Sequence, residues 1–173
     1  SELDATYALP PSRVHVVPPG ITPPACTSQT DAVPRVLYVG SVFNRRHVPD
    51  LIRAFAPVAR DHSDASLDIV GDNRTRPYQD LAMLIDATGL PSRIRWRRWL
   101  PDAELTALYG SARAFAFLSD YEGLGLTPLE ALAVGVPSVL FDTPVARESC
   151  GDAALYVPAG NIRAITAALR QIL

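Results

Sequence analysis

Two hydrophobic patterns alternate along the chain from residue 35 onwards. Short runs rich in β-branched and aromatic residues, typical of buried strands, cover residues 36–39, 66–70, 94–96, 114–118, 138–141 and 155–157. Between these runs, apolar residues recur at helical spacing, as in Leu51, Ile52, Phe55 and Val58, in Leu81, Leu84, Ile85 and Ala87, and in Ile162, Ile165, Leu169 and Ile172. This alternation predicts an α/β fold in which helices cover both faces of a parallel sheet.

The strand count predicts the strand order and, with it, the position of a ligand. A doubly wound parallel sheet of six strands commonly has the order 3-2-1-4-5-6. Ligands of such sheets bind in the crevice beyond the carboxyl ends of strands 1 and 4, where the order reverses. Residues 40–47 follow the first expected strand and residues 119–127 follow the fourth. We therefore expect these two loops to form the site.

Residues 1–34 differ from the rest of the chain. Prolines punctuate them, and only residues 13–17 alternate in the manner of a strand. We interpret residues 1–34 as an interdomain linker, or hinge, with one short strand. Residues 35–173 form one folded domain in this interpretation, and we expect that domain to be part of a longer protein.

Composition and charge argue against several classes of protein. The chain has 173 residues, of which 48% are hydrophobic, and this suits one domain with a sizeable core. Its net charge of -2 argues against a nucleic-acid partner. The basic and aromatic segment 93–99 is therefore interpreted as a strand whose Ile94 and Trp96 point inward and whose arginines are solvated. Because the two cysteines match no metal-ligand spacing and no apolar run approaches the roughly 20 residues of a membrane span, we expect a cytoplasmic protein.

The second loop leads into a helix and carries two glycines. Thr127 suits the N-cap of that helix and Pro128 its first position. The backbone amides of residues 123–127 can then converge at the positive end of the helix, a geometry that favours phosphate. Two plainer interpretations stay open: Thr127 and Glu130 have the spacing of a capping box, and Glu122 resembles a solvated loop carboxylate.

The first loop places two adjacent arginines, Arg45 and Arg46, and His47 beyond strand 1. A guanidinium offers a planar fork for phosphate oxygens. The alternative is a solvated basic turn, although basic residues at the start of a helix oppose its dipole. Asp120 and Glu122 in the second loop resemble a metal-binding pair, but no third ligand accompanies them, and we expect no metal.

The second loop and the helix after it carry a family resemblance. Residues 122–137, Glu-Gly-Leu-Gly-Leu-Thr-Pro-Leu-Glu-Ala-Leu-Ala-Val-Gly-Val-Pro, resemble the Glu-x7-Glu signature of retaining family 4 glycosyltransferases (group 1) with the GT-B fold. Similar segments lie at residues 14–21, 68–72, 100–105 and 151–157. The resemblance implies that residues 35–173 are the Rossmann-like, nucleotide-sugar-binding half of a GT-B fold, and that an N-terminal acceptor domain precedes the hinge.

The resemblance also implies roles for single residues. Glu122 would lie at the donor sugar as the catalytic residue, and Glu130 would hold the ribose hydroxyls. Trp99 and Leu100 would border the base. The residues that would contact the diphosphate or the donor sugar are Ser41, Arg45, Arg46, Gly123, Leu124, Gly125, Leu126 and Thr127.

The chain departs from this family in its phosphate-binding pair, an Arg after the strand-1 glycine and a Lys five positions on. Ser41 and Arg46 occupy these positions, and Arg45 would replace the missing charge. The implied reaction retains the anomeric configuration and uses no metal or other cofactor. Its donor is a nucleoside-diphosphate sugar. Its acceptor is a sugar, lipid or other hydroxyl compound bound by the N-terminal domain. Any peripheral association with a membrane would occur through that domain.

Other functions stay open at this point. A nucleotide-sugar epimerase or phosphorylase has the same fold, and a non-catalytic nucleotide-binding module would need the same loops. A phosphorelay receiver would need an acidic cluster after strand 1, where this chain has Ser41 and two arginines. We expect residues 1–173 alone to bind nucleotide sugar weakly and to transfer nothing.

Overall fold

The expected strands form in the computed structural model, which describes residues 6–7, 10–15, 17, 20–26 and 33–173. The strands are β1 (Arg35–Val39), β2 (Ser66–Val70), β3 (Ile94–Arg97), β4 (Ala114–Phe117), β5 (Ser138–Phe141) and β6 (Ala154–Val157). The helices are α2 (Val48–Asp61), α3 (Leu81–Ala87), α4 (Asp102–Ser111), α5 (Leu126–Ala133), α6 (Pro144–Cys150) and α7 (Ile162–Ile172). Two 3-10 helices are η1 (Pro11–Arg13) and η2 (Asn44–Arg46).

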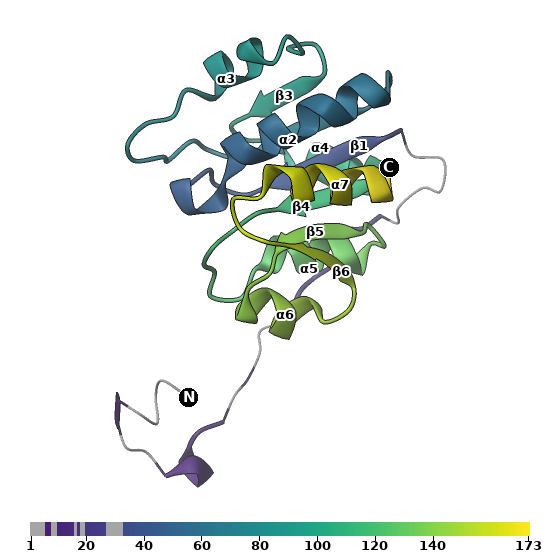
Figure 1. Ribbon diagram of the computed structural model, residues 1–173. Coiled ribbons are helices and arrows are strands. Elements are labelled where there is room, and N and C mark those ends of the chain that lie inside the picture. Colours follow the sequence, from purple (N-terminus) through teal and green to yellow (C-terminus); the bar gives the residue numbers. More distant parts are fainter. Residues whose placement is uncertain (1–5, 8–9, 16, 18–19, 27–32) are drawn as a thin grey trace.

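All six strands lie parallel in one sheet of order β3-β2-β1-β4-β5-β6, which confirms the predicted order. The chain advances from β1 toward one edge and from β4 toward the other. Because parallel crossovers are right-handed, α2 and α5 lie on opposite faces of the sheet. Figure 1 shows α2 and α7 side by side on one face, with α4 and α5 on the other. In the described part of the chain, no helix has the length and apolar character needed to cross a bilayer.

A row of stacked aromatic rings lies in the middle of the core. The ring of Tyr38 stacks on Phe117 with 5.7 Å between centroids, and Phe117 stacks on Phe115 at 6.4 Å. Phe115 in turn stacks on Tyr109 of α4 at 6.0 Å. Both tyrosines are at most 1% exposed, so the row buries a hydroxyl at each end. Buried hydroxyls require hydrogen-bond partners, and those of this row are the carbonyl of Ser41 and the carboxylate of Glu130.

The short strand expected at residues 13–17 does not form in its described residues. Arg13 ends η1, and residues 14, 15 and 17 have no strand structure, while residue 16 lies outside the described part. A strand needs a neighbour to pair its backbone groups. The sheet offers this segment none, since its order runs from β3 to β6 without it.

The arginines around β3 are bound more closely than the sequence pattern indicates. Ile94 is buried and Trp96 is partly buried, as expected. Arg93, however, donates hydrogen bonds to the carbonyl oxygens of Ala59 (2.6 Å) and Ala65 (2.8 Å). The expectation of solvated arginines is therefore wrong for Arg93, whereas Arg95 and Arg98 are exposed as expected.

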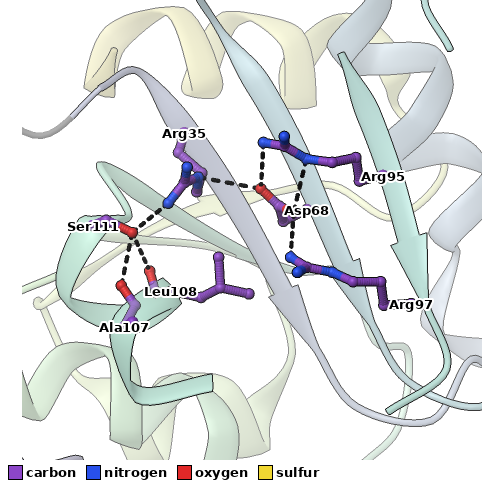
Figure 2. A network of polar contacts seen from close by, with 7 residues as sticks. All are labelled: Arg35, Asp68, Arg95, Arg97, Ala107, Leu108 and Ser111. Atoms are coloured by element: carbon purple, nitrogen blue, oxygen red, sulfur yellow. Dashed lines mark hydrogen bonds and ion pairs between the residues drawn. The ribbon is translucent and has the colours of Figure 1, made fainter. Parts of the chain in front are cut away.

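A buried carboxylate forms ion pairs with three arginines on one face of the sheet (Figure 2). Asp68 of β2 is fully buried. Its oxygens lie 3.2 Å from Nε of Arg35 on β1, 3.3 Å from Nε of Arg95 and 2.6 Å from Nη2 of Arg97 on β3. Arg35 also donates to the hydroxyl of Ser111 at the end of α4. Asp68 therefore ties three adjacent strands together.

We predict that Asp68→Asn lowers the free energy of unfolding by about 3 kcal/mol, because it leaves three guanidinium groups around a site without negative charge. Urea denaturation measures the loss. Asp64→Asn makes the same change at an exposed position in the turn before β2 and should alter stability little. Equal stability of the wild type and the Asp68→Asn variant would show that the cluster contributes nothing to the fold.

Candidate functional site

The turn after β1 folds Arg46 back over the end of the sheet. A Cβ at Gly40 would lie 2.8 Å from Nη1 of Arg46, so a residue with a side chain would obstruct the guanidinium. Nη1 of Arg46 donates to the carbonyl of Ser41 (3.0 Å), and the guanidinium lies 4.9 Å from the ring centre of Phe117. The hydroxyl of Tyr38 donates to the same carbonyl (3.1 Å). Ser41 thus shapes the turn through its main chain.

The helix after the second loop begins earlier than the sequence signals indicate. Gly125, with φ 81°, precedes the first residue of α5 in a left-handed conformation that glycine adopts readily. The prediction of Thr127 as N-cap and Pro128 as first helical residue is therefore wrong, because they take the second and third positions. Proline fits there since first-turn amides have no partner within the helix. The capping box does not form, and Glu130 instead accepts a hydrogen bond from the hydroxyl of Tyr109 (2.9 Å).

The two loops meet beyond β1 and β4, as the strand order predicts. Nε and Nη2 of Arg46 donate to the two carboxylate oxygens of Glu122 at 2.6 and 2.9 Å, a bidentate pair. The hydroxyl of Ser119 donates to the same carboxylate (2.9 Å). The amide of Asp120 donates to the carbonyl of Arg45 (2.9 Å). Backbone and side-chain bonds therefore join the loops at several points.

Glu122 is an ionised carboxylate that is largely buried, in contrast to the solvated carboxylate of the plainer interpretation. Its side chain is 17% exposed. Burial opposes its ionisation, but the hydrogen bonds from Arg46 and Ser119 outweigh burial and lower the pKa of Glu122. Burial likewise opposes the charge of Arg46, and the bond to Glu122 outweighs it and raises the pKa of Arg46. The pair thus carries one charge of each sign at neutral pH.

A cavity of about 300 Å³ opens beside this pair. Its lining comes from the first loop, β4, the second loop and the first turn of α5: Arg46, Phe117, Glu122, Leu124, Gly125, Leu126 and Thr127. A larger cavity of about 350 Å³ is lined by residues that include Asn44, His47 and Met83, and by none of the expected donor-binding residues. The smaller cavity is the candidate site because the paired charges and the start of a helix line it.

Some expected site residues lie apart from this cavity. Trp99 and Leu100 follow β3, two strands away from β1, and neither is among the described residues that line the cavity. Leu100 is buried in the core, whereas Trp99 is 73% exposed. Arg45 lies with its guanidinium 4.5 Å from the ring centre of Phe43 and 3.8 Å from the carboxylate of Glu122. Arg45 therefore borders the pair without completing it.

His47 joins the two loops in a way that its sequence position does not reveal. It has φ 44° and is the one non-glycine residue with a left-handed backbone among those described. Nδ1 lies 3.0 Å from Asp50 of α2 and Nε2 lies 2.6 Å from Asp120. The ring meets Phe141 edge-on at 5.1 Å. A histidine that contacts a carboxylate with each ring nitrogen donates to both only when it is protonated.

The pKa of His47 is raised, and carboxylates are the cause. Burial alone would lower it, but hydrogen bonds with Asp120 and Asp50 outweigh burial. The sequence pattern places His47 in the first loop but does not reveal these two partners. The signal available was the pair of aspartates flanking the loops, three residues after His47 and directly after Ser119.

This arrangement predicts a pH-dependent contribution to stability. Because the folded pKa lies above the usual 6.5, the stabilisation is complete below that value and is lost as pH rises through the folded pKa. His47→Asn keeps a residue that tolerates the left-handed backbone but removes the imidazolium. Urea denaturation between about pH 5.5 and 9 should show a wild-type advantage that shrinks as pH rises. His15→Asn, at an exposed position, is the control, and a pH-independent difference at His47 would contradict the bridge.

Comparison with known proteins gives a family. Residues 28–173 match the family model described as Glycosyl transferases group 1. The chain is 31% identical over 137 residues to the O-antigen chain mannosyltransferase B of Escherichia coli. That match covers 79% of this chain and 36% of the relative, so the chain spans about a third of the relative's length.

Solved structures share the fold. WaaG, a glycosyltransferase involved in lipopolysaccharide biosynthesis, has a TM-score of 0.76 at 20% identity, over 99% of this chain and 50% of that one. The pneumococcal O-GlcNAc transferase GtfA, in complex with UDP and GlcNAc, has a TM-score of 0.78 at 20% identity, over 98% and 35%. The sheet is thus the Rossmann-like half of a GT-B fold, and the chain belongs to the glycosyl transferases of group 1.

Proposed function

We propose that this chain is the donor-binding domain of a retaining, metal-independent hexosyltransferase. It would bind a nucleoside-diphosphate sugar whose sugar passes to an acceptor hydroxyl. The observation that carries the proposal is the position of Arg46 and Glu122, side by side in one cavity at the start of α5. Glycosyl transfer develops negative charge on the diphosphate and positive charge on the sugar, and an Arg–Glu pair can stabilise both.

The diphosphate would bind at the Arg46 side of the cavity. A phosphate can take the guanidinium fork that Glu122 now occupies. The first amides of α5, at Leu126 and Thr127, have no partner within the helix and lie at its positive end. Arg45, 3.8 Å from Glu122, adds a second positive charge in place of the family's Arg, whose position Ser41 occupies here. These groups support charge compensation without a metal.

The sugar would bind at the Glu122 side. An ionised carboxylate stabilises the oxocarbenium character that develops when the bond between the anomeric carbon and the diphosphate oxygen breaks. The electron pair stays with the diphosphate. The acceptor oxygen bonds to the anomeric carbon on the same face, and its proton passes to the departing phosphate oxygen. Glu122 is already ionised by Arg46 and Ser119, so it needs no proton transfer before this step.

Other residues would bind the rest of the donor, and the acceptor would bind elsewhere. Glu130 would meet the ribose, and the segment of Trp99 and Leu100 would border the base. The mannosyltransferase relative supports mannose as the donor sugar. The acceptor, a sugar, lipid or other hydroxyl compound, would bind a domain outside residues 1–173, and any peripheral contact with a membrane would belong to that domain. A reducing, cytoplasmic setting suits Cys26 and Cys150, which are both free thiols.

We predict that Arg46→Ala weakens binding of nucleoside diphosphates at least about tenfold, because it removes a charged bidentate partner of the phosphate. Calorimetric titration with GDP, UDP and ADP, and with GDP-mannose and UDP-GlcNAc, measures the affinity and identifies the base and sugar. Arg60→Ala removes the same charge at an exposed position near the far end of α2 and should leave binding unchanged. If no nucleotide binds to the wild type, the donor-site proposal is wrong.

Glu122→Gln should separate binding from transfer. Removing the negative charge frees Arg46 for phosphate, so we expect GDP or UDP to bind severalfold more tightly than to the wild type. A longer protein that carries both domains should lose nearly all transfer with the same substitution, as measured by product formation from radiolabelled donor. Weaker nucleotide binding in Glu122→Gln would contradict the competition between carboxylate and phosphate. Residues 1–173 alone should transfer nothing, and product formed by them would contradict the two-domain division.

A further inference from the structure

Tyr109 carries a hydroxyl that packing does not require. The residue is 1% exposed, and its ring stacks on Phe115 with an interplanar angle of 18°. A phenylalanine would fill the same space and avoid burying a polar atom. The hydroxyl makes one hydrogen bond in the described structure, to Oε2 of Glu130 at 2.9 Å. The role of the hydroxyl is therefore its hydrogen bond to Glu130.

Glu130 is held by one of its two oxygens. It lies in the second turn of α5, half-buried, and Tyr109 is the partner of Oε2. Oε1 has no hydrogen-bond partner within the described parts of the chain. A glutamate on a helix has several rotamers, and a bond to a rigid, buried group selects one of them. With Oε2 fixed, Oε1 keeps one direction and stays available as an acceptor.

The hydroxyl of Tyr109 is a dependable donor. Burial raises the pKa of Tyr109, and the charge of Glu130 raises it further, so the hydroxyl keeps its proton throughout the physiological range. The ring has little freedom to move, because it ends the row of stacked rings that runs through Phe115 and Phe117 to Tyr38. The donor direction is therefore set by the core of the domain rather than by the surface loops.

We propose that Tyr109 is a positioning residue that orients Glu130 toward the ribose hydroxyls of the donor and so lets the domain distinguish ribonucleotides from nucleotides without these hydroxyls. This inference rests on the proposed function, in which Glu130 meets the ribose. It adds a residue from α4, outside both site loops. The spacing of Thr127 and Glu130 favoured a local helix cap, whereas the structure connects Glu130 to a neighbouring helix.

The test compares GDP with 2′,3′-dideoxy-GDP, and UDP with 2′,3′-dideoxy-UDP, by calorimetric titration. The wild type should prefer the ribonucleotide. Tyr109→Phe, which keeps the ring, should lose about 3- to 10-fold of that preference, an effect in the range of one hydrogen bond. Affinity for the dideoxy form should stay near the wild-type value. Glu130→Gln should lose the preference as well, and adding Tyr109→Phe to it should change the ratio little further.

Tyr156→Phe is the matched control, because it removes a tyrosine hydroxyl that donates to the carbonyl of Gly151 (2.7 Å), away from the cavity. Its ribose preference should equal that of the wild type. An unchanged preference in Tyr109→Phe would overturn the positioning role, even where Arg46→Ala still abolishes binding and the donor site stands. An unchanged preference in Glu130→Gln would overturn it too, by removing the ribose contact. Absence of nucleotide binding in the wild type would instead defeat the proposed function itself.

Discussion

The direct pairing of β1 with β4 is the constraint on which the site depends. These two strands lie side by side in parallel, with Val36 opposite Ala114 and Leu37 opposite Phe115, although the intervening strands of the chain lie elsewhere. Parallel strands end at the same edge of a sheet, so the loops after β1 and β4 must emerge together. The residues of the two loops do not by themselves bring the loops together. The pairing of the buried, apolar strands β1 and β4 does so, and the loops supply the polar side chains of the site.

The bidentate bond between Arg46 and Glu122 is the consequence. Two opposite charges brought to one edge neutralise each other when no ligand is bound, and their mutual bond lowers the cost of removing both from water. Under the proposed function, a phosphate would therefore replace a carboxylate at Arg46 rather than enter an empty site. Such an exchange would limit affinity, since part of the interaction energy is spent on breaking the existing pair. It would also leave Glu122 free for the donor sugar.

The sequence predicts the fold and the position of the candidate site, but not the hydrogen bonds and ion pairs between its side chains. Six β-rich runs with helical stretches between them determine a doubly wound sheet, and the strand order follows from general rules of handedness. Pairings across the sheet do not follow in this way. Glu122 and Arg46 are separated by 76 residues, and no local pattern shows that one will bind the other. Asp68 likewise sits in a β-rich run, and its three arginine partners come from other strands.

The misplaced start of α5 has a different cause. Thr127 and Pro128 are both strong helix-start signals, yet Gly125 begins the helix because it alone in that loop end adopts φ 81° without strain. Local signals competed, and the backbone freedom of a glycine decided the outcome. One consequence is that the first amides of the helix stay clear of a side-chain cap. A capping threonine would have occupied the amides that a phosphate needs.

The two carboxylates of the signature are thus held by opposite means. Glu122 is bound by the charged Arg46, with which a phosphate would compete under the proposed function, so its environment would change on donor binding. Glu130 is bound by a neutral, buried hydroxyl that phosphate cannot reach, so its orientation does not depend on the ligand. The row of aromatic rings contacts both: Phe117, within the row, lies beneath the guanidinium of Arg46, and Tyr109, at one end of the row, binds Glu130. A rigid core can in this way support an exchangeable contact and a fixed one within the same signature.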